Sequence, residues 1–325
     1  MDNKRQMGYV KSIFQGPACP GHHNPCANVP KDTIMDIQSV FTNSSGKTIH
    51  SIVCGQGKKP LHFLHANGFC AGVYLPFYTY FEKEFRIVAT DIPGHGDSDH
   101  HDMARILHWD IFVDDVKQAM EKNMETPVVG VGHSLGAVIT LLAAAKHPGL
   151  FSHIILIDPV IFSKPMIFLL YLAKKADLMK HNPLASGARR RKTRFKNHDE
   201  ALRRFSSGRG MFKTWRDEFV QSYCDHGLKW EADGSGQLKC DPETEAQIYE
   251  SVLLDIWNYP GRITCPVLLI RGERSTTFTP SAASILRKKI PGACLETVPG
   301  ASHFIPMEKP VECMKLIENF LKNKA

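Results

Sequence analysis

Short apolar runs alternate with amphipathic segments over most of the chain. β-Branched and apolar runs bounded by Gly, Pro or Asn predict eight strands, at 34–41, 47–54, 61–65, 85–90, 127–131, 153–157, 267–270 and 295–298. The first two are joined by a hairpin-type connection at 42–46. Apolar residues at helical spacing predict helices at 73–81, 108–123, 137–145, 279–289 and 310–322. This alternation predicts an α/β protein with a mostly parallel eight-stranded sheet and helices on both faces.

The alternation is interrupted for about a hundred residues after residue 158. We therefore expect three parts: an irregular N-terminal arm at 1–32, a core made of 33–158 and 261–325, and an insertion at 159–260. The insertion has helical patterns at 165–180, 199–205, 213–225 and 242–257, and a hairpin pattern at 228–240.

The insertion begins with a strongly apolar stretch at 160–172. We expect this stretch to pack on the core. Two alternatives are the wall of an acyl-chain pocket and a patch that faces a membrane.

The pentapeptide at 132–136 reads Gly-His-Ser-Leu-Gly. A predicted buried strand precedes it and a predicted helix follows it. A serine between a strand and a helix, flanked by glycines, indicates a nucleophile elbow, in which a strained turn lifts the hydroxyl above the end of a sheet. Three further polar residues, Asn67, Asp158 and His303, also follow predicted strands. Because ligands bind at the carboxyl ends of parallel strands, these residues and Ser134 should converge there.

The sequence resembles the α/β-hydrolase fold superfamily from about residue 33 to the C-terminus, apart from the insertion. The resemblance rests on the elbow, on the glycine-rich loop at 91–98 and on the Gly-Ala-Ser-His-Phe loop at 300–304, which match in order and spacing. It implies a helical cap or lid at 159–260. It also implies that Ser134 is the nucleophile and that His303 is its base. The N–H groups of Leu135 and Asn67 would form the oxyanion hole, although the usual His-Gly of that loop is His65-Ala66 here.

The sequence offers two candidates for the acid that would orient His303, because Ser275 occupies the commonest family position for it. Serine cannot supply the negative charge that stabilises an imidazolium. Asp158 is our preferred acid, since some branches of the superfamily place it at the end of that strand. Glu273, two residues before the usual position, is the alternative. Dehalogenases and epoxide hydrolases of this fold carry Asp at the nucleophile position, so Ser134 argues against both.

Charge is concentrated in one segment. The net charge is +7, whereas residues 174–213 alone hold thirteen Lys/Arg and three Asp/Glu, a local +10. The basic run at 188–196 is most simply a solvated face or loop. Next to an apolar helix it could instead bind anionic lipid, which would give weak membrane-surface contact through 166–196. We expect no nucleic-acid partner, since charge is present without a recognised motif.

Cysteine usage predicts a reducing, cytoplasmic setting, because the nine cysteines are odd in number and include no C-x-x-C pair. The cluster of Cys19, His22, His23 and Cys26 could suggest a metal, but no second ligand pair lies nearby, and we expect neither metal nor cofactor. We also expect no secretory signal at the N-terminus and no run long enough to span a bilayer.

Together these features predict a serine hydrolase that cleaves a carboxylic ester, lactone or related acyl bond through an acyl-enzyme on Ser134. The substrate would be a small, apolar, ester-type molecule. Acyl transfer, perhydrolysis and C–C cleavage can use the same groups. Two other functions remain open: a non-catalytic receptor or scaffold of the same fold, and an interfacial lipid hydrolase that uses the basic part of the insertion.

Overall fold

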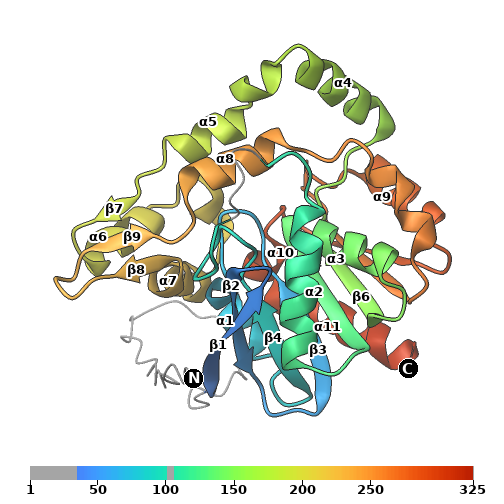
Figure 1. Cartoon of the computed structure of the whole chain (residues 1–325), viewed down its shortest axis with the longest axis horizontal. Helices are drawn as coiled ribbons and strands as arrows, with labels where there is room; N and C mark the ends of the chain where they lie inside the picture. The colour runs from blue at the N-terminus through green and yellow to red at the C-terminus, as the bar shows by residue number, and fades with distance from the viewer. Residues whose placement is uncertain (1–34, 101–105, 325) are drawn as a thin grey trace.

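A computed structural model describes residues 35–100 and 106–324, so the arm with its Cys/His cluster lies outside the described residues. The main sheet has eight strands: β1 Ile37–Ser44, β2 Lys47–Cys54, β3 Lys59–Leu64, β4 Phe85–Thr90, β5 Val128–His133, β6 Phe151–Ile157, β10 Val267–Gly272 and β11 Cys294–Val298. Their order is β1-β2-β4-β3-β5-β6-β10-β11. The strand β2 is antiparallel to both neighbours, and all other neighbours are parallel. The expected mostly parallel sheet is confirmed (Figure 1).

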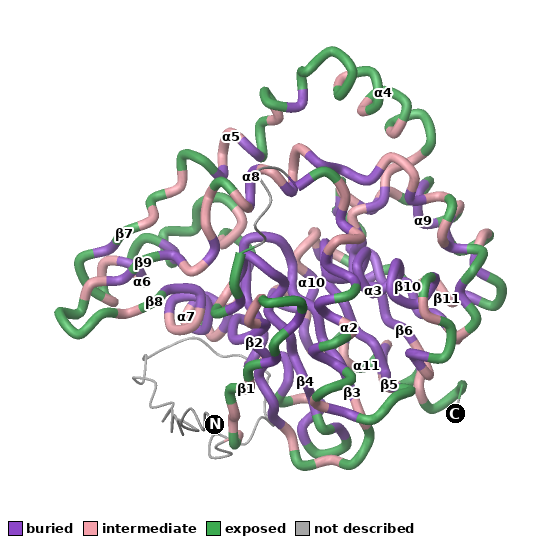
Figure 2. Tube along the Cα trace, in the orientation of Figure 1, coloured by how far each residue is buried: buried purple, intermediate pink, exposed green. Residues whose placement is uncertain are grey.

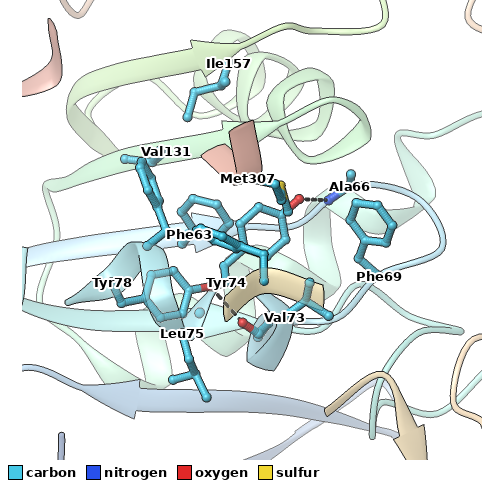
Figure 3. Packing of buried hydrophobic residues seen from close by; sticks show 14 of the residues in the cluster. Phe63, Ala66, Phe69, Val73, Tyr74, Leu75, Tyr78, Val131, Ile157 and Met307 are labelled. Carbon is cyan, nitrogen blue, oxygen red and sulfur yellow. Dashed lines mark hydrogen bonds between the residues drawn. The ribbon is translucent and has the colours of Figure 1, made fainter. Parts of the chain in front are cut away.

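Helices cover both faces of the sheet (Figure 1): η1 Ala71–Tyr74, α1 Leu75–Tyr78, α2 Ile111–Asn123, α3 Leu135–Lys146, α9 Pro280–Lys289, α10 Ile305–Glu308 and α11 Pro310–Asn323. Successive strand residues point to opposite faces, so Ile155 enters one apolar cluster and Leu156 the other. The first cluster contains residues of α1 and α11, and the second contains residues of α2, α3 and α9. In the first, the Phe63 ring lies 4.7 Å from Tyr74 and 5.2 Å from Tyr78 between centroids (Figure 3).

Two expected boundaries in the core differ from the structure. The helix expected at 73–81 is a 3-10 turn followed by the four-residue α1, which has a proline in its first turn. The connection expected at 42–46 contains only Ser45 and Gly46, with φ of 51° and 85°. A two-residue turn with positive φ matches the twist of a hairpin, so β1 extends to Ser44.

The insertion consists of short elements: α4 Lys164–Lys175, η2 Leu178–His181, α5 Pro183–Arg189, β7 Arg194–Phe195, α6 His198–Phe205, η3 Gly210–Thr214, α7 Asp217–His226, β8 Leu228–Trp230, β9 Gly236–Leu238, α8 Pro242–Glu250 and η4 Ile256–Asn258, with η5 Pro260–Arg262 at the return to the core. The expected hairpin is present as antiparallel β8 and β9, and β7 adds a third strand to it. The patterns at 165–180, 213–225 and 242–257 each form a shorter helix plus a 3-10 turn.

The expectation that the apolar stretch 160–172 packs on the core is wrong for most of its length. Ile161 is fully buried in the second cluster, but α4 contains no buried residue at all. The second cluster is already covered by α2, α3 and α9, and the half-buried Ile167 is the one residue of α4 that packs against it. In Figure 2, α4 is coloured exposed and intermediate along its whole length. Within the described ranges, every helix is too short or too polar to cross a bilayer.

The turn between β5 and α3 allows no side chain at its glycines. A Cβ on Gly136 would lie 2.3 Å from the Leu64 carbonyl oxygen, and one on Gly132 would lie 2.4 Å from the Gly136 oxygen. Both oxygens belong to backbone, which cannot move aside as a flexible side chain can. The glycines therefore let α3 begin directly against β3 and β5.

We predict that Gly136→Ala lowers the free energy of unfolding by about 1–3 kcal/mol, the range typical of forced overpacking. Gly187→Ala is the matched control, because a Cβ in this part of α5 meets nothing within 4 Å. That variant should gain about 0.5–1 kcal/mol from lower unfolded-state entropy. Urea denaturation of both variants measures the difference, and equal stability of the two would contradict the packing argument.

Candidate active site

Ser134 lies on a strained turn at the carboxyl end of β5. Its backbone has φ 58° and ψ −114°, a conformation rare for a residue with a side chain. The Ser134 N–H donates to the Ile157 carbonyl at 2.9 Å, which fixes the turn to the neighbouring strand β6. Such strain persists only where the surroundings hold it. The turn places the side chain at the end of the sheet, with Ser134 only 5% exposed.

Three of the expected residues meet there in one hydrogen-bonded row. The Ser134 Oγ lies 2.9 Å from His303 Nε2, and His303 Nδ1 lies 2.8 Å from Asp158 Oδ1. Asp158 follows β6 and His303 follows β11, so the row joins three strand ends that are far apart in sequence. Because a carboxylate oxygen accepts, His303 Nδ1 is the donor to Asp158 Oδ1, and Nε2 faces the serine hydroxyl.

Asp158 is held by donors other than the histidine. Its Oδ2 accepts from the Gly272 N–H at 2.8 Å, and its Oδ1 accepts from the Ser275 hydroxyl at 2.6 Å. The serine at the commonest family position for the acid thus serves Asp158 as a hydrogen-bond donor. The alternative acid, Glu273, is exposed, and its carboxylate accepts from the Gly300 N–H at 2.7 Å. The contacts in the described chain therefore favour Asp158 over Glu273.

The two residues expected to supply the oxyanion hole, Leu135 and Asn67, lie in segments that a backbone hydrogen bond joins. Leu135 is the first residue of α3, where backbone N–H groups have no partner within the helix. Asn67 lies in the loop after β3, and the Gly136 N–H donates to the His65 carbonyl at 3.1 Å to hold that loop against α3. The Asn67 side chain is engaged elsewhere: Nδ2 donates to the Glu245 carbonyl at 3.0 Å, and Oδ1 lies 3.0 Å from His95 Nε2.

A second hydrogen-bonded chain, missed from the sequence, links the same loops. His133 Nε2 lies 2.9 Å from the His303 carbonyl oxygen, which can only accept, so Nε2 carries the proton. His133 Nδ1 therefore accepts from the Tyr74 hydroxyl at 2.7 Å. The Tyr74 oxygen in turn accepts from the Ala66 N–H at 3.1 Å (Figure 3). Burial lowers the pKa of His133 to about 3, helped by the nearby His303, so this imidazole stays neutral.

The insertion contacts the site through a polar group on one side. The Arg191 guanidinium contacts the Glu245 carboxylate and the Tyr223 hydroxyl. This group sits directly on the loop after β3, since a Cβ on Gly68 would lie 2.8 Å from Glu245 Oε1. A side chain at position 68 would therefore prevent α8 from seating against the Asn67 loop.

On the other side the insertion contributes aromatic rings. The Trp215 ring lies 5.3 Å from Phe69 and 5.6 Å from Phe304 between centroids. These two partners follow Asn67 and His303 in the chain, so the indole bridges both loops. The Arg216 N–H fixes this segment by donating to the Met307 carbonyl at 3.1 Å. The result is an apolar wall of aromatic rings beside His303.

One group in the described chain has the geometry to be considered for a metal ion. One ligand atom from each of His50, Asp91 and Asp97 lies within 4.8 Å of the other two. Asp91 Oδ2 is already 2.7 Å from His50 Nδ1, and the Asp97 carboxylate accepts from Lys239 at 2.6 Å. These internal partners account for the group, and we assign no metal to it.

The chain has relatives among known proteins in both sequence and structure. A family model described as "Alpha/beta hydrolase family" matches residues 63–316. Human "Epoxide hydrolase 4" is 24% identical over 97% of this chain and 88% of its own length. The "2-(acetamidomethylene)succinate hydrolase" of Mesorhizobium japonicum is 25% identical over 82% and 89%. A solved structure of an E-2-(acetamidomethylene)succinate hydrolase superposes with a TM-score of 0.71, at 22% identity, covering 88% of this chain and 99% of that one.

The buried histidines of the site should make the free energy of unfolding depend on pH. Burial lowers the pKa of His95, like that of His133, to about 3, whereas an unfolded histidine titrates near 6.5. Between these values the unfolded chain binds more protons than the folded one, so stability falls as the pH falls through this window.

We predict that His95→Gln reduces this pH dependence. The Asn67 Oδ1 must accept, because its Nδ2 donates to a carbonyl, so a glutamine amide N–H can replace His95 Nε2–H. The slope of unfolding free energy against pH should fall by about 1 kcal/mol per pH unit between about pH 5 and pH 6. Urea denaturation across this range is the measurement. The exposed His181, changed to Gln, should leave the slope unaltered, and an unaltered slope in the His95 variant would refute the prediction.

Proposed function

The chain belongs to the alpha/beta hydrolase family, and we propose that it is a serine hydrolase that cleaves a carboxylic ester, lactone or related acyl bond. The observation that carries this proposal is the row of Ser134, His303 and Asp158, with contacts of 2.9 and 2.8 Å. A nucleophile, a base within hydrogen-bond reach and a group that orients the base are the three parts required for acyl transfer through a serine.

In the proposed reaction, Ser134 Oγ attacks the carbonyl carbon while His303 Nε2 takes its proton. The imidazolium that forms keeps its Nδ1–H directed at the Asp158 carboxylate, which stabilises the positive charge. The N–H groups of Leu135 and Asn67 receive the developing oxyanion. His303 then gives its proton to the leaving alkoxide. A water molecule, deprotonated by the same nitrogen, attacks the acyl carbonyl carbon. His303 then returns the proton to Ser134 Oγ as the bond between this oxygen and the acyl carbon breaks and the acid product leaves.

The identity of residue 134 as serine helps to distinguish between epoxide hydrolysis and acyl transfer. One relative is named an epoxide hydrolase, at 24% identity. Epoxide hydrolases of this fold carry an aspartate at the nucleophile position, whereas this chain has a serine with its hydroxyl on a histidine. A serine forms an ester with an acyl group and leaves the acyl carbonyl for water to attack, which favours an acyl substrate.

The surroundings of the row support a small apolar substrate and a lid role for residues 159–260. Ser134 is 5% exposed, and the aromatic wall of Phe69, Trp215 and Phe304 adjoins His303. A covering of this kind excludes water and shapes the acyl pocket. The seven cysteines in the described residues are free thiols, which supports our proposal of a cytoplasmic location.

We predict that a fluorophosphonate probe labels the folded protein at Ser134. The hydroxyl activated by His303 should displace fluoride from phosphorus, and mass spectrometry of the digested protein locates the adduct. Ser134→Ala is the control and should take up no label while keeping the wild-type circular dichroism. A folded wild-type protein that does not label would instead support the receptor or scaffold alternative.

We predict that Asp158→Asn lowers kcat by about four orders of magnitude, as loss of the correct tautomer does in a related arrangement. The Gly272 N–H requires an acceptor at Oδ2, so the asparagine must direct its NH₂ at His303 Nδ1. That nitrogen then accepts, and Nε2–H faces Ser134 and cannot take its proton. Glu273→Gln is the matched variant and should retain kcat within about twofold. The opposite ranking, measured on p-nitrophenyl esters, would identify Glu273 as the acid.

A further inference from the structure

The exposed apolar side chains of the described residues are concentrated in one stretch of the chain. Seven of the nine large exposed hydrophobics lie between residues 166 and 184: Met166, Phe168, Leu169, Tyr171, Leu172, Leu178 and Leu184. We refer to these seven residues as the α4 surface. Phe168 and Leu184 are the most exposed of the seven, at 60% and 61%. Scattered apolar residues are normal on a protein surface, but a gathering of this kind marks an interaction site.

The helix α4 differs from an ordinary surface helix because even the side that carries Ile167, Leu170 and Ala173 is only half-buried. It is apolar from Met166 to Ala173, yet none of its twelve residues falls in the buried class. In Figures 1 and 2 it stands at the outer edge of the molecule, away from the sheet. Twelve residues make about 18 Å of helix, well short of the roughly 30 Å hydrocarbon core of a bilayer. The length therefore suits a helix that lies in an interface and excludes one that spans it.

Cations flank this apolar helix at both ends. Lys164 begins it, and Lys174 and Lys175 end it. Within the described residues none of these three ammonium groups has an ion pair, and the Lys175 Nζ lies 5.1 Å from the Tyr171 ring centroid. Asp177 is the single acid between residues 164 and 184, and its carboxylate accepts from Lys180 at 2.6 Å. The α4 surface is thus apolar with a net positive rim.

Three of the six cations in the basic run at 188–196, which was considered from the sequence as a lipid-binding element, are engaged within the insertion. Arg189 makes ion pairs with Glu243 at 2.7 Å and with Glu250 at 2.5 Å. Arg191 pairs with Glu245, and Lys192 pairs with Glu200 at 2.5 Å. These acids come from α8 and α6, so the three cations hold the insertion together. Lys164, Lys174 and Lys175 belong to the exposed apolar helix itself, which places them for an external partner.

We propose that the α4 surface docks on a membrane containing anionic phospholipid, with α4 lying in the plane of the interface. Its apolar side chains would enter the acyl boundary, while the stems of Lys164, Lys174 and Lys175 extend to bring their ammonium groups to the headgroup phosphates. A second copy of the chain fits this surface less well, because pairing two copies would bring their lysine-flanked helices together. A lipid phosphate supplies the negative charge that a second copy lacks.

Flotation of the full-length protein with vesicles tests this proposal without reference to catalysis. We predict flotation with vesicles of phosphatidylcholine and phosphatidylserine, and weaker flotation with phosphatidylcholine alone. The double variant Phe168→Ser/Leu169→Ser should lower partitioning on the mixed vesicles about tenfold or more, because two apolar anchors are lost. Lys174→Glu/Lys175→Glu should lower it by a similar factor, since each lysine near an anionic surface contributes about 1 kcal/mol.

Matched controls use residues of the same type elsewhere on the surface. Phe41→Ser removes a phenylalanine of β1 that is also 60% exposed, and Lys288→Glu reverses an exposed charge on α9. Both should float like the wild type. Wild-type protein that stays unbound on the mixed vesicles, or equal binding by the α4 variants, would overturn the proposal. A dimer in light scattering that Phe168→Ser/Leu169→Ser dissociates, with no flotation, would assign the surface to a second copy and overturn it as well.

Discussion

The arrangement of the site depends on one backbone constraint, the positive φ of Ser134 at the end of β5. An L-residue occupies this region only at a cost of about 1–3 kcal/mol, so the surrounding structure must hold it there. Two features do so. The Ser134 N–H is tied to β6, and glycines at 132 and 136 let β3 and α3 close around the turn at backbone contact distance. Strand order then places the ends of β3 and β6 on either side of the serine.

A second requirement is that the loops after β3, β5 and β11 keep fixed positions relative to one another. The chain from the Ala66 N–H through Tyr74 and His133 to the His303 carbonyl joins all three. An unsatisfied buried polar group costs about 1–3 kcal/mol, so breaking one link penalises its neighbours as well. This network requires a neutral His133, because one ring nitrogen must donate and the other must accept. Asp158 is held in the same way by Gly272 and Ser275.

Local patterns in the sequence were sufficient for the sheet and for the positions of Ser134 and His303, because strand ends and glycine turns have local signatures. Partners that meet only through the fold were less accessible. His133 and Tyr74 are separated by 59 residues, and nothing near either one indicates that they pair. Ser275 argued against the usual acid position, but its contact with Asp158 depends on how β10 lies beside β6. Apolar composition at 160–172 likewise could not show that the core face was already covered.

The insertion joins the site to the outer surface through one continuous layer of helices. The helix α4 contacts η2, η2 contacts α5, and α5 packs on α8. Ala185 and Ala188 of α5 lie against Ala246 of α8, and such small side chains leave little slack between two helices. The residue before Ala246 is Glu245, whose carbonyl accepts from the Asn67 side chain in the loop after β3. Contacts between successive elements therefore run from the α4 surface to the loop that carries Asn67.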